Sequence, residues 1–169
     1  DLLLQLRGSV LTIWLNRPAA KNSLSPTMVE ELQAVLEAVQ GDRSVRTLIL
    51  RGKGGTFCAG ADLKGFKSGA QGGSPNEDEV ARGNRSFGDL MIKLNEQPQV
   101  VIMLVDGAAI GGGFCLASAA DIRIASDAAY FRAAGINNGL TSAELGISYL
   151  LPRQIGFARA FDILLTGRD

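Results

Sequence analysis

Three short aliphatic runs, each preceded by a helix-like stretch, constrain the fold of this chain more than any other feature. The runs are Thr47–Leu50, Val100–Val105 and Ile122–Ala125, and the first two have the composition of buried strands. Strands that alternate with helices give an α/β fold. We predict a single domain over residues 1–169, because this length suits one core and no linker interrupts the chain.

The remaining segments extend this pattern at both ends. Residues Leu2 to Leu15 predict two strands that turn at Arg7-Gly8-Ser9. Ser25 followed by Pro26 predicts the start of a helix, and apolar residues recur at helical spacing until Gly41. Further helices are expected around Phe87–Leu94, Phe114–Ala120, Ser142–Leu151 and Gln154–Leu165, the last two separated by Pro152.

Two glycine-rich stretches are expected to be loops. The first runs from Gly52 to Gly73 and continues into the polar tract Ser74–Glu79, which predicts a long functional loop or lid. The second runs from Gly107 to Gly113 and leads into a helix. Neither has the glycine spacing of a Walker motif or of a dinucleotide-binding motif, which argues against nucleotide hydrolysis and hydride transfer.

These glycine stretches expose backbone N–H groups. Gly60-Ala61 and Gly111–Gly113 lack bulky side chains, and the second stretch opens a helix whose first N–H groups have no partner within the helix. If the two stretches face each other, one N–H from each forms a site for a developing oxyanion. The alternative is that the glycines serve only tight turns and close helix packing. Composition alone leaves both alternatives open.

Composition excludes several classes of function. The chain has no histidine, which excludes Ser-His-Asp and Cys-His couples and histidine metal sites, and we expect no metal. Equal numbers of basic and acidic residues, 17 of each, argue against a nucleic-acid partner. No apolar run is long enough to predict a membrane span. Two cysteines and no signal peptide predict a cytoplasmic location.

Three segments, Leu15–Leu24, Phe57–Lys64 and Asp106–Asp121, carry a resemblance to a known family, and the closing Leu165–Arg168 adds to it. In order along the chain, they resemble motifs of the enoyl-CoA hydratase/isomerase (crotonase) family. The resemblance implies a spiral of ββα units that binds coenzyme A thioesters, without a separate cofactor, and passes through a thioester enolate. It also implies a homotrimer or a dimer of trimers. Family chains continue past this point, so we expect a missing C-terminal helical part.

The resemblance also assigns roles to residues. The amides of Ala61 and Gly112 match the two donors that hold the thioester oxygen. Arg17, Lys21 and Lys64 would lie near the phosphates of coenzyme A, unless they are ordinary solvated surface charges. The residues that match the family's coenzyme A and substrate-binding segments are Ala19, Lys21, Ala59, Gly60, Ala61, Asp62, Leu63, Lys64, Gly111, Gly112 and Gly135.

The chain departs from the family at two important positions. Hydratases of the family use two glutamates, but here the matching positions hold Cys115 and Gly135, so a two-glutamate hydration is not supported. Glu144 is another carboxylate. It lies five residues before Tyr149, which resembles the position of the catalytic aspartate in dienoyl-CoA isomerases and aryl-CoA dehalogenases.

Two interpretations of Glu144 remain open. With Ser142 as the cap, Glu144 falls in the first turn of a predicted helix, where the helix dipole favours a carboxylate in any protein. As a catalytic base, it would need apolar neighbours to raise its pKa, and Leu140, Leu145 and Ile147 are available in the sequence.

Four other residues receive structural interpretations. Cys115 is expected to be a small buried residue, although an exposed helix N-terminus would lower its pKa. Asp62 and Asp121 are expected to hold backbone geometry. Tyr149 is expected to pack, with orientation of Glu144 as the alternative.

Two functional hypotheses follow. In the first, Ala61 and Gly112 stabilise an enolate while Glu144 moves a proton, which one base can do in a double-bond isomerisation, although hydration by a single glutamate stays open. In the second, the protein is a non-catalytic acyl-CoA binder that has lost the usual glutamates.

Overall fold

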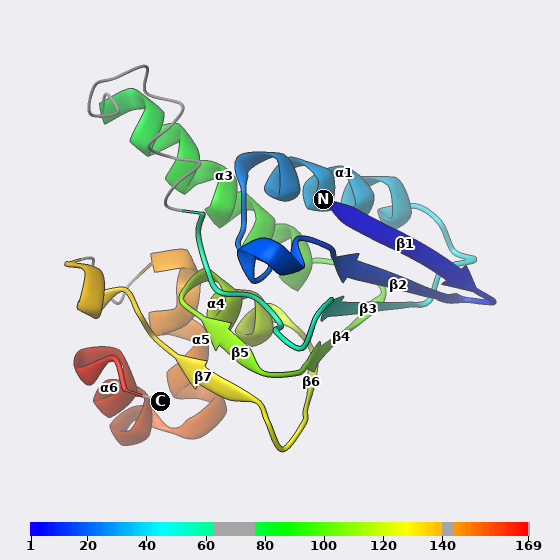
Figure 1. Ribbon diagram of the computed structural model, residues 1–169. Helices are drawn as coiled ribbons and strands as arrows, with labels where there is room; N and C mark the ends of the chain where they lie inside the picture. Colours follow the sequence, from blue (N-terminus) through cyan, green and yellow to red (C-terminus); the bar gives the residue numbers. More distant parts are fainter. Residues whose placement is uncertain (63–76, 140–143, 169) are drawn as a thin grey trace.

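A five-stranded sheet organises the chain, of which the computed structural model describes residues 1–62, 77–139 and 144–168, without the side chains of 77–82, 84 and 144. The strand order is β1-β2-β3-β4-β6 (Figure 1). Strands β1 (Leu2–Arg7) and β2 (Val10–Leu15) form the predicted antiparallel hairpin. The parallel strands that follow are β3 (Thr47–Gly52), β4 (Val100–Val105) and β6 (Ile122–Ala125). The predicted α/β class is therefore confirmed.

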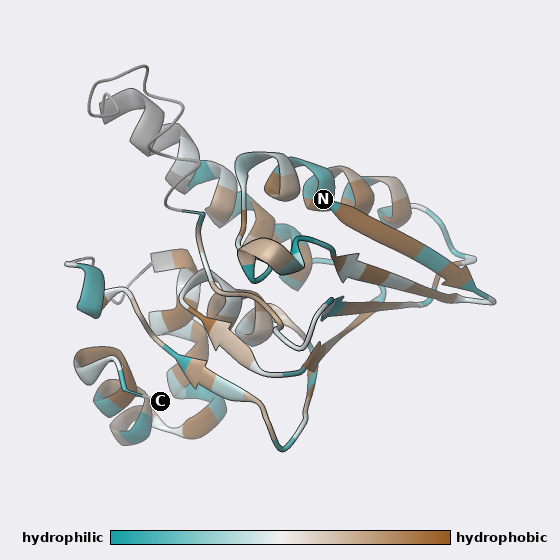
Figure 2. Cartoon of the chain, in the orientation of Figure 1, coloured by the Kyte–Doolittle hydropathy of each residue, from teal (hydrophilic) through white to brown (hydrophobic). Residues whose placement is uncertain are grey.

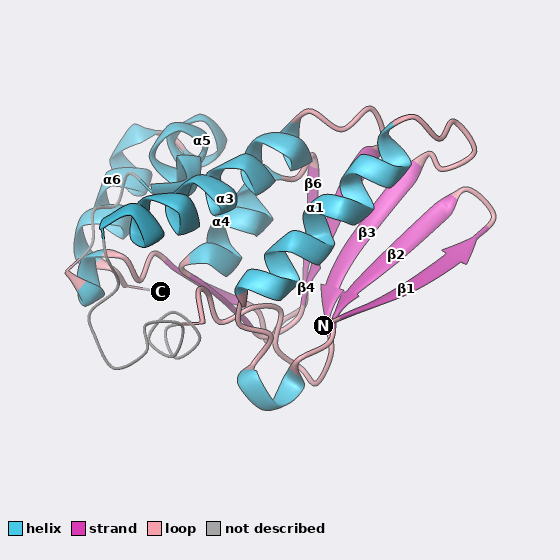
Figure 3. Cartoon of the chain, turned by 90° about the horizontal axis from the view of Figure 1, so that it is seen from above, coloured by secondary structure: helices cyan, strands magenta, loops and turns pink. Residues whose placement is uncertain are grey.

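Helix α1 (Pro26–Gln40) begins and ends where the sequence predicts. The Ser25 hydroxyl accepts a hydrogen bond from the N–H of Met28 at 3.1 Å, and Pro26 occupies the first turn, where no N–H is needed. Each large apolar side chain buried by this helix contributes about 1.5–3 kcal/mol. Figure 3 shows α1 and α3 on the same face of the sheet. The buried side chains of α1 are Met28, Val29, Leu32 and Leu36.

Helix α3 (Glu77–Asn95) starts earlier than expected. It begins inside the tract Ser74–Glu79, so the loop prediction is wrong for residues 77–79. Acidic side chains are stabilised near a helix N-terminus, and the run Glu77-Asp78-Glu79 therefore suits a helix start as well as a loop. The rest of the predicted lid, residues 63–76, lies outside the described residues. The expected apolar face is confirmed, because Phe87, Leu90, Met91 and Leu94 are buried.

A second sheet consists of β5 (Ala108–Ile110) and β7 (Tyr130–Arg132), which the sequence pattern did not reveal. Three residues are too few to show an alternation, and β5 lies within the glycine-rich stretch expected to be a loop. Strand β5 leads into α4 (Gly112–Ala119), whose residues 113–119 are all buried. The orders β1-β2-α1 and β4-β5-α4 each form a ββα unit, as the resemblance implied.

The two C-terminal helices divide at a different residue from the one predicted. Helix α5 (Ile147–Ile155) contains Pro152, and α6 (Phe157–Thr166) follows after Gly156. Proline removes one backbone donor without ending this helix, whereas the φ of +85° at Gly156 cannot continue it. The prediction that Pro152 separates the helices is therefore wrong.

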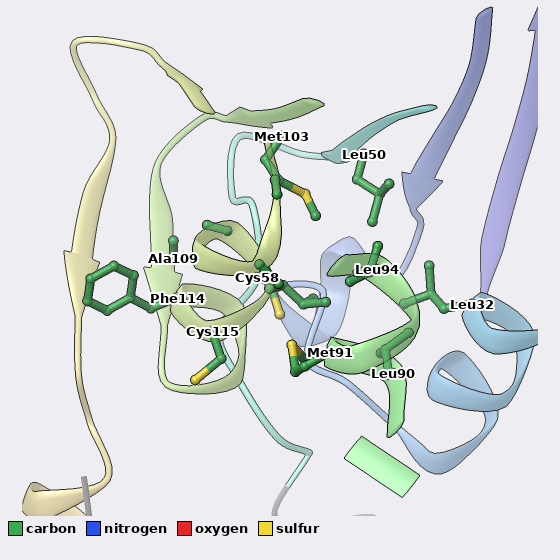
Figure 4. Close-up of a cluster of buried hydrophobic side chains, with 14 of the residues drawn as sticks. Leu32, Leu50, Cys58, Leu90, Met91, Leu94, Met103, Ala109, Phe114 and Cys115 are labelled. Atoms are coloured by element: carbon green, nitrogen blue, oxygen red, sulfur yellow. The ribbon is translucent and has the colours of Figure 1, made fainter. Parts of the chain in front are cut away.

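The core lies between the sheet and helices α1, α3 and α4. In Figure 4, Leu32 of α1, Leu50 of β3, Leu90 of α3 and Met103 of β4 lie around one buried cluster. Figure 2 shows that the strands of the main sheet are largely hydrophobic. Alternate residues of β2, β3 and β4 are buried, whereas β1 and β6 are largely exposed.

The parallel register places three connecting segments at one edge of the sheet. Because β2, β3 and β4 run in the same direction, their carboxyl ends lie together. The segments that leave this edge are 16–24, 53–62 and 106–113. Ligands commonly bind outside the carboxyl ends of parallel strands, so this edge is where a site should be sought.

Candidate functional site

The segment 58–62 forms the centre of the candidate site and is hydrogen-bonded to the turn that follows β2. The N–H of Ala59 donates to the carbonyl of Lys21 at 3.0 Å. The N–H of Leu24 donates to the carbonyl of Gly60 at 2.8 Å, and the N–H of Asp62 donates to the carbonyl of Leu24 at 3.0 Å. These last two bonds make a parallel bridge between Leu24 and Ala61.

On its other side, this segment is bonded to β5. The N–H of Cys58 donates to the carbonyl of Ala108 at 2.9 Å, and the carbonyl of Cys58 accepts from the N–H of Ile110 at 2.9 Å. Gly60 approaches the same strand, because a methyl group on it would lie 2.8 Å from the carbonyl oxygen of Ile110. The three segments therefore form one hydrogen-bonded unit.

The bridge to Leu24 determines where the Ala61 N–H points. In a parallel bridge, the residue whose two neighbours bond to the partner strand directs its own N–H away from that strand. Here the bonding neighbours are Gly60 and Asp62, so the Ala61 N–H points away from Leu24. A methyl group on Gly112 would lie 3.7 Å from the nitrogen of Ala61, which places the two residues next to each other.

Both N–H groups are available to a ligand. Gly112 is the first residue of α4, where a helical N–H has no partner within the helix. Among the residues that the structure describes, neither Gly112 nor Ala61 donates its N–H to an acceptor. Ala61 is also exposed, whereas Gly60 is buried. Two adjacent amides without an acceptor form an arrangement that can hold a negatively charged oxygen.

The glycines of the two stretches also have a structural role. Gly60 has a φ of +93° and Gly111 a φ of +51°, conformations that other residues rarely adopt. A methyl group on Gly113 would lie 2.3 Å from the carbonyl oxygen of Cys58, so only glycine lets α4 approach that segment. These glycines therefore do serve turns and close packing, but this does not decide whether they serve only that purpose, because the same packing brings the two N–H groups together.

The remaining predicted binding residues lie around this unit. Ala19 lies in a short helical turn at Pro18–Ala20 and is exposed, and Lys21 is exposed next to it with a φ of +51°. Leu63 and Lys64 lie outside the described residues. Gly135 precedes a second short turn at Ile136–Asn138.

Arg17 is held by internal contacts. Its guanidinium donates to the carbonyl of Ser23 at 2.7 Å and to the carboxylate of Asp62 at 2.8 Å. Only 23% of its side chain is exposed, so it is not the solvated surface charge that was one alternative for it. The partner of the Asp62 carboxylate in this contact is a side chain, so the expectation that Asp62 holds backbone geometry stays a prediction. Asp121 does bond to backbone, as expected, because its carboxylate accepts from the N–H of Val101 at 2.8 Å.

Both cysteines are free and buried. Cys115 is 5% exposed, which confirms its expected place as a small buried residue of α4 (Figure 4). Burial raises the pKa of the Cys58 thiol to about 12. Within the described ranges, no three histidine, cysteine, aspartate or glutamate side chains gather as metal ligands.

Glu144 does not lie in the first turn of a long helix. It opens a short 3-10 turn, Glu144–Gly146, in which Leu145 has a φ of +53°, and α5 begins only at Ile147. The helix-start interpretation is wrong because Gly146, with a φ of +77°, caps α5 instead. Ser142 and Leu140 lie outside the described residues, as does the side chain of Glu144.

Tyr149 does not pack in the core as expected. It is 61% exposed, and the guanidinium of Arg153 lies 3.6 Å from the centre of its ring. Both residues are on α5, four positions apart, so the contact is a local one on the helix surface.

Comparison of the sequence with known proteins identifies the family of this chain. The profile of the family described as enoyl-CoA hydratase/isomerase matches residues 5–169. The chain belongs to this family. It is 48% identical to a probable enoyl-CoA hydratase of Mycobacterium tuberculosis, an alignment that covers 96% of this chain and 58% of that relative.

Solved structures of the family share the fold. A probable enoyl-CoA hydratase/isomerase from Mycobacterium abscessus superposes with a TM-score of 0.88 at 43% identity, covering 99% of this chain and 62% of that one. An enoyl-CoA hydratase from Bacillus anthracis gives a TM-score of 0.92 at 34% identity and covers 63% of that chain. The chain therefore spans less than two thirds of the length of these relatives.

None of the helices in the described part of the chain is long and apolar enough to cross a membrane.

Sequence reasoning missed the residues that hold the site together. The side chain of Asn22 is fully buried and donates to the carbonyls of Lys53 and Thr56 at 2.8 and 2.7 Å, while it accepts from the N–H of Arg17 at 2.9 Å. Its φ of +53° is one that asparagine tolerates better than most residues. An asparagine within the turn after a strand was the available signal.

Proposed function

We propose that this protein is an acyl-CoA enzyme that stabilises the enolate of a thioester at Ala61 and Gly112. The observation that supports this proposal is the pair of adjacent N–H groups, neither of which donates to an acceptor within the described residues. Membership of the enoyl-CoA hydratase/isomerase family supports the thioester as the ligand.

In the proposed reaction, the thioester carbonyl oxygen accepts both N–H groups. Removal of a proton from the α carbon moves charge onto that oxygen, so these hydrogen bonds strengthen as the enolate forms. Loss of one such donor typically lowers kcat by about 10²–10³-fold. Because Ala61 belongs to the hydrogen-bonded unit around segment 58–62 and the helix that Gly112 opens packs closely against Cys58, the two donors need no rearrangement when charge develops.

Glu144 is the proposed base. Its carboxylate would take a proton from the α carbon of an unsaturated thioester and return it to the γ carbon, which shifts the double bond. One base suffices for this shuttle, whereas addition of water is best served by two groups. Cys115 and Gly135 stand where the family's hydratases have their glutamates, so the chain favours isomerase-like chemistry over two-glutamate hydration.

Coenzyme A is proposed to lie along the turn and the segment next to it. The residues proposed for this contact are Ala19, Lys21, Ala59, Gly60, Leu63, Lys64, Gly111 and Gly135. Asp62, which the resemblance also assigns to this segment, has its carboxylate bonded to Arg17 and is not proposed to contact coenzyme A. Lys21 is exposed beside the segment and carries a charge that suits a phosphate.

By analogy with the family, the assembly is proposed to be a homotrimer or a dimer of trimers. The buried free cysteines support a cytoplasmic location.

The Glu144→Gln variant tests the proposal, with turnover measured on a panel of 2-enoyl-, 3-enoyl- and dienoyl-CoA thioesters. We expect the wild-type protein to shift a double bond and the variant to lose at least about 100-fold in kcat, a typical contribution of a proton-transfer group. Affinity for free coenzyme A should stay unchanged. A variant as active as the wild type would rule out Glu144 as the base.

A second candidate function is acyl-CoA binding without turnover. It is favoured by the absence of both hydratase glutamates, at Cys115 and Gly135. This candidate predicts that crotonyl-CoA binds in calorimetry. It also predicts that the absorbance of the conjugated double bond stays constant with every thioester in the panel. Turnover of any thioester by the wild-type protein, lost in Glu144→Gln, would exclude it.

A further inference from the structure

Arg17 joins the two chain segments that set the direction of the Ala61 N–H. One arm of its guanidinium donates to the carbonyl and the hydroxyl of Ser23, at 2.7 and 3.2 Å. The other arm donates to the carboxylate of Asp62 at 2.8 Å. The carboxylate of Asp1 lies 3.6 Å from the Arg17 Nε. All of these groups belong to the protein, so Arg17 is committed to internal contacts.

The position of these contacts along the chain is informative. Ser23 immediately precedes Leu24, and Asp62 immediately follows Ala61. The guanidinium therefore spans the Leu24–Ala61 bridge, one residue away from it on each side. A shift of either segment would change the direction of the Ala61 N–H, because that direction depends on both hydrogen bonds of the bridge.

The chemistry of the contact suits a fixed geometry. An arginine presents its donors in a rigid planar fork, whereas a lysine offers a single flexible point charge. The Asp62 side chain is 14% exposed, so water screens this ion pair less than it screens a surface pair. Displacement of a catalytic group by about 1 Å can cost about 100-fold in rate. A small error in the position of Ala61 would therefore be visible in catalysis.

We propose that Arg17 and Asp62 are positioning residues, which hold the Ala61 N–H at the angle needed to share an oxyanion with Gly112. This inference rests on the proposed function of the same site. It gives Arg17 a role in catalysis that does not involve contact with coenzyme A. The prediction that distinguishes it is a loss of enolate stabilisation without a loss of coenzyme A affinity.

The test compares Arg17→Lys and Asp62→Asn with a matched control, Arg168→Lys. Arg168 forms an exposed ion pair with Asp162 on α6, so the control makes the same substitution away from the site. Three quantities are measured: kcat, the dissociation constant of free coenzyme A, and that of acetoacetyl-CoA, whose enolate occupies an oxyanion site. We expect kcat and acetoacetyl-CoA affinity to fall about 10- to 100-fold in both variants, with coenzyme A affinity and the control unchanged.

Two outcomes would overturn the proposal. Unchanged kcat and acetoacetyl-CoA affinity would show that Arg17 does not position the donor. An equal loss of affinity for free coenzyme A and for acetoacetyl-CoA would show a general structural role instead.

Hydrogen exchange of the free protein separates this proposal from the proposed function. Exchange of the Leu24 and Asp62 amides should be faster in Arg17→Lys than in the wild type, because these amides form the bridge. If the wild-type protein binds no thioester at all, the proposed function fails, and the exchange rates still report whether Arg17 holds the bridge. Unchanged exchange at both amides would refute that role.

Discussion

Substitution by alanine of two adjacent glycines at the start of α4 should affect different properties. Gly112→Ala should lower activity and keep stability, whereas Gly113→Ala should lower stability. A methyl group on Gly112 would lie 3.2 Å from a terminal methyl of Leu24 and 3.7 Å from the Ala61 nitrogen. The first contact is slightly tight, but it involves the end of a side chain that can move, at a cost of about 1 kcal/mol. Alanine in a helix gains about 0.5–1 kcal/mol over glycine. Gly112→Ala should therefore change stability by less than about 1 kcal/mol.

The same methyl group would crowd the space in front of the Ala61 N–H. An oxyanion that needs both donors would be displaced, and loss of one donor typically costs about 10²–10³-fold in kcat. We therefore expect Gly112→Ala to melt within about 4 °C of the wild type and to lose at least about 10-fold in kcat and in acetoacetyl-CoA affinity. A variant with wild-type turnover and acetoacetyl-CoA affinity would refute the oxyanion role of this pair.

Gly113→Ala is the paired perturbation. Its methyl group would lie 2.3 Å from the carbonyl oxygen of Cys58 and 2.8 Å from the Cys58 Cβ, and neither atom can move without shifting backbone. Overpacking of this kind costs about 1–3 kcal/mol or more, a large part of the stability of a domain. Thermal melting should therefore fall by at least about 4 °C in Gly113→Ala. Equal stability of the two variants would contradict the packing described for α4.

Two further predictions concern buried polar groups. Asn22→Ala should lower the free energy of unfolding by about 3–5 kcal/mol in urea titration, because it leaves the carbonyls of Lys53 and Thr56 without their donor; a loss below about 1 kcal/mol would show that water replaces the amide. The Cys58 thiol, with its pKa raised to about 12, stabilises the fold below pH 9 and should lose that contribution as pH rises from 9 to 12. The stability of the wild type should therefore fall relative to Cys58→Ala by up to about 1.4 kcal/mol per pH unit in that window, and parallel pH profiles would contradict the assignment.

The elements predicted from the sequence are those whose signals are local. Helix α1 has its cap at Ser25, a proline in the first turn and a regular apolar face, so its bounds follow from neighbouring residues alone. The aliphatic strands β3 and β4 are long enough to be recognised by composition. Strands β5 and β7 have no pattern of their own, and they form because β5 pairs with β7 on one side and with the segment at Cys58 on the other. The pairing of β5 with β7 joins residues 22 positions apart, such as Ala108 and Tyr130.

The same distinction applies to the site. Ala61 and Gly112 were identified through motifs, but the reason for their proximity lies in the Leu24 bridge and in the contact of Gly113 with Cys58. The sequence does not show that the Arg17 guanidinium turns inward, because the position of Asp62 relative to Ser23 depends on the fold. For Glu144 the local signal predicts the wrong helix start. Gly146, with its positive φ, places the start of α5 after Glu144.

A site built from backbone N–H groups has a different sequence signature from one built from reactive side chains. The chain has no histidine, and its two cysteines are buried, so neither residue type marks this edge of the sheet as a site of nucleophilic chemistry. The proposed donors can work only if neighbouring groups fix their direction, and those groups are Asn22, Arg17 and Asp62. In such a site, the residues that hold the loops should be as sensitive to substitution as the donor positions, because every substitution except proline keeps the backbone N–H and can only move it.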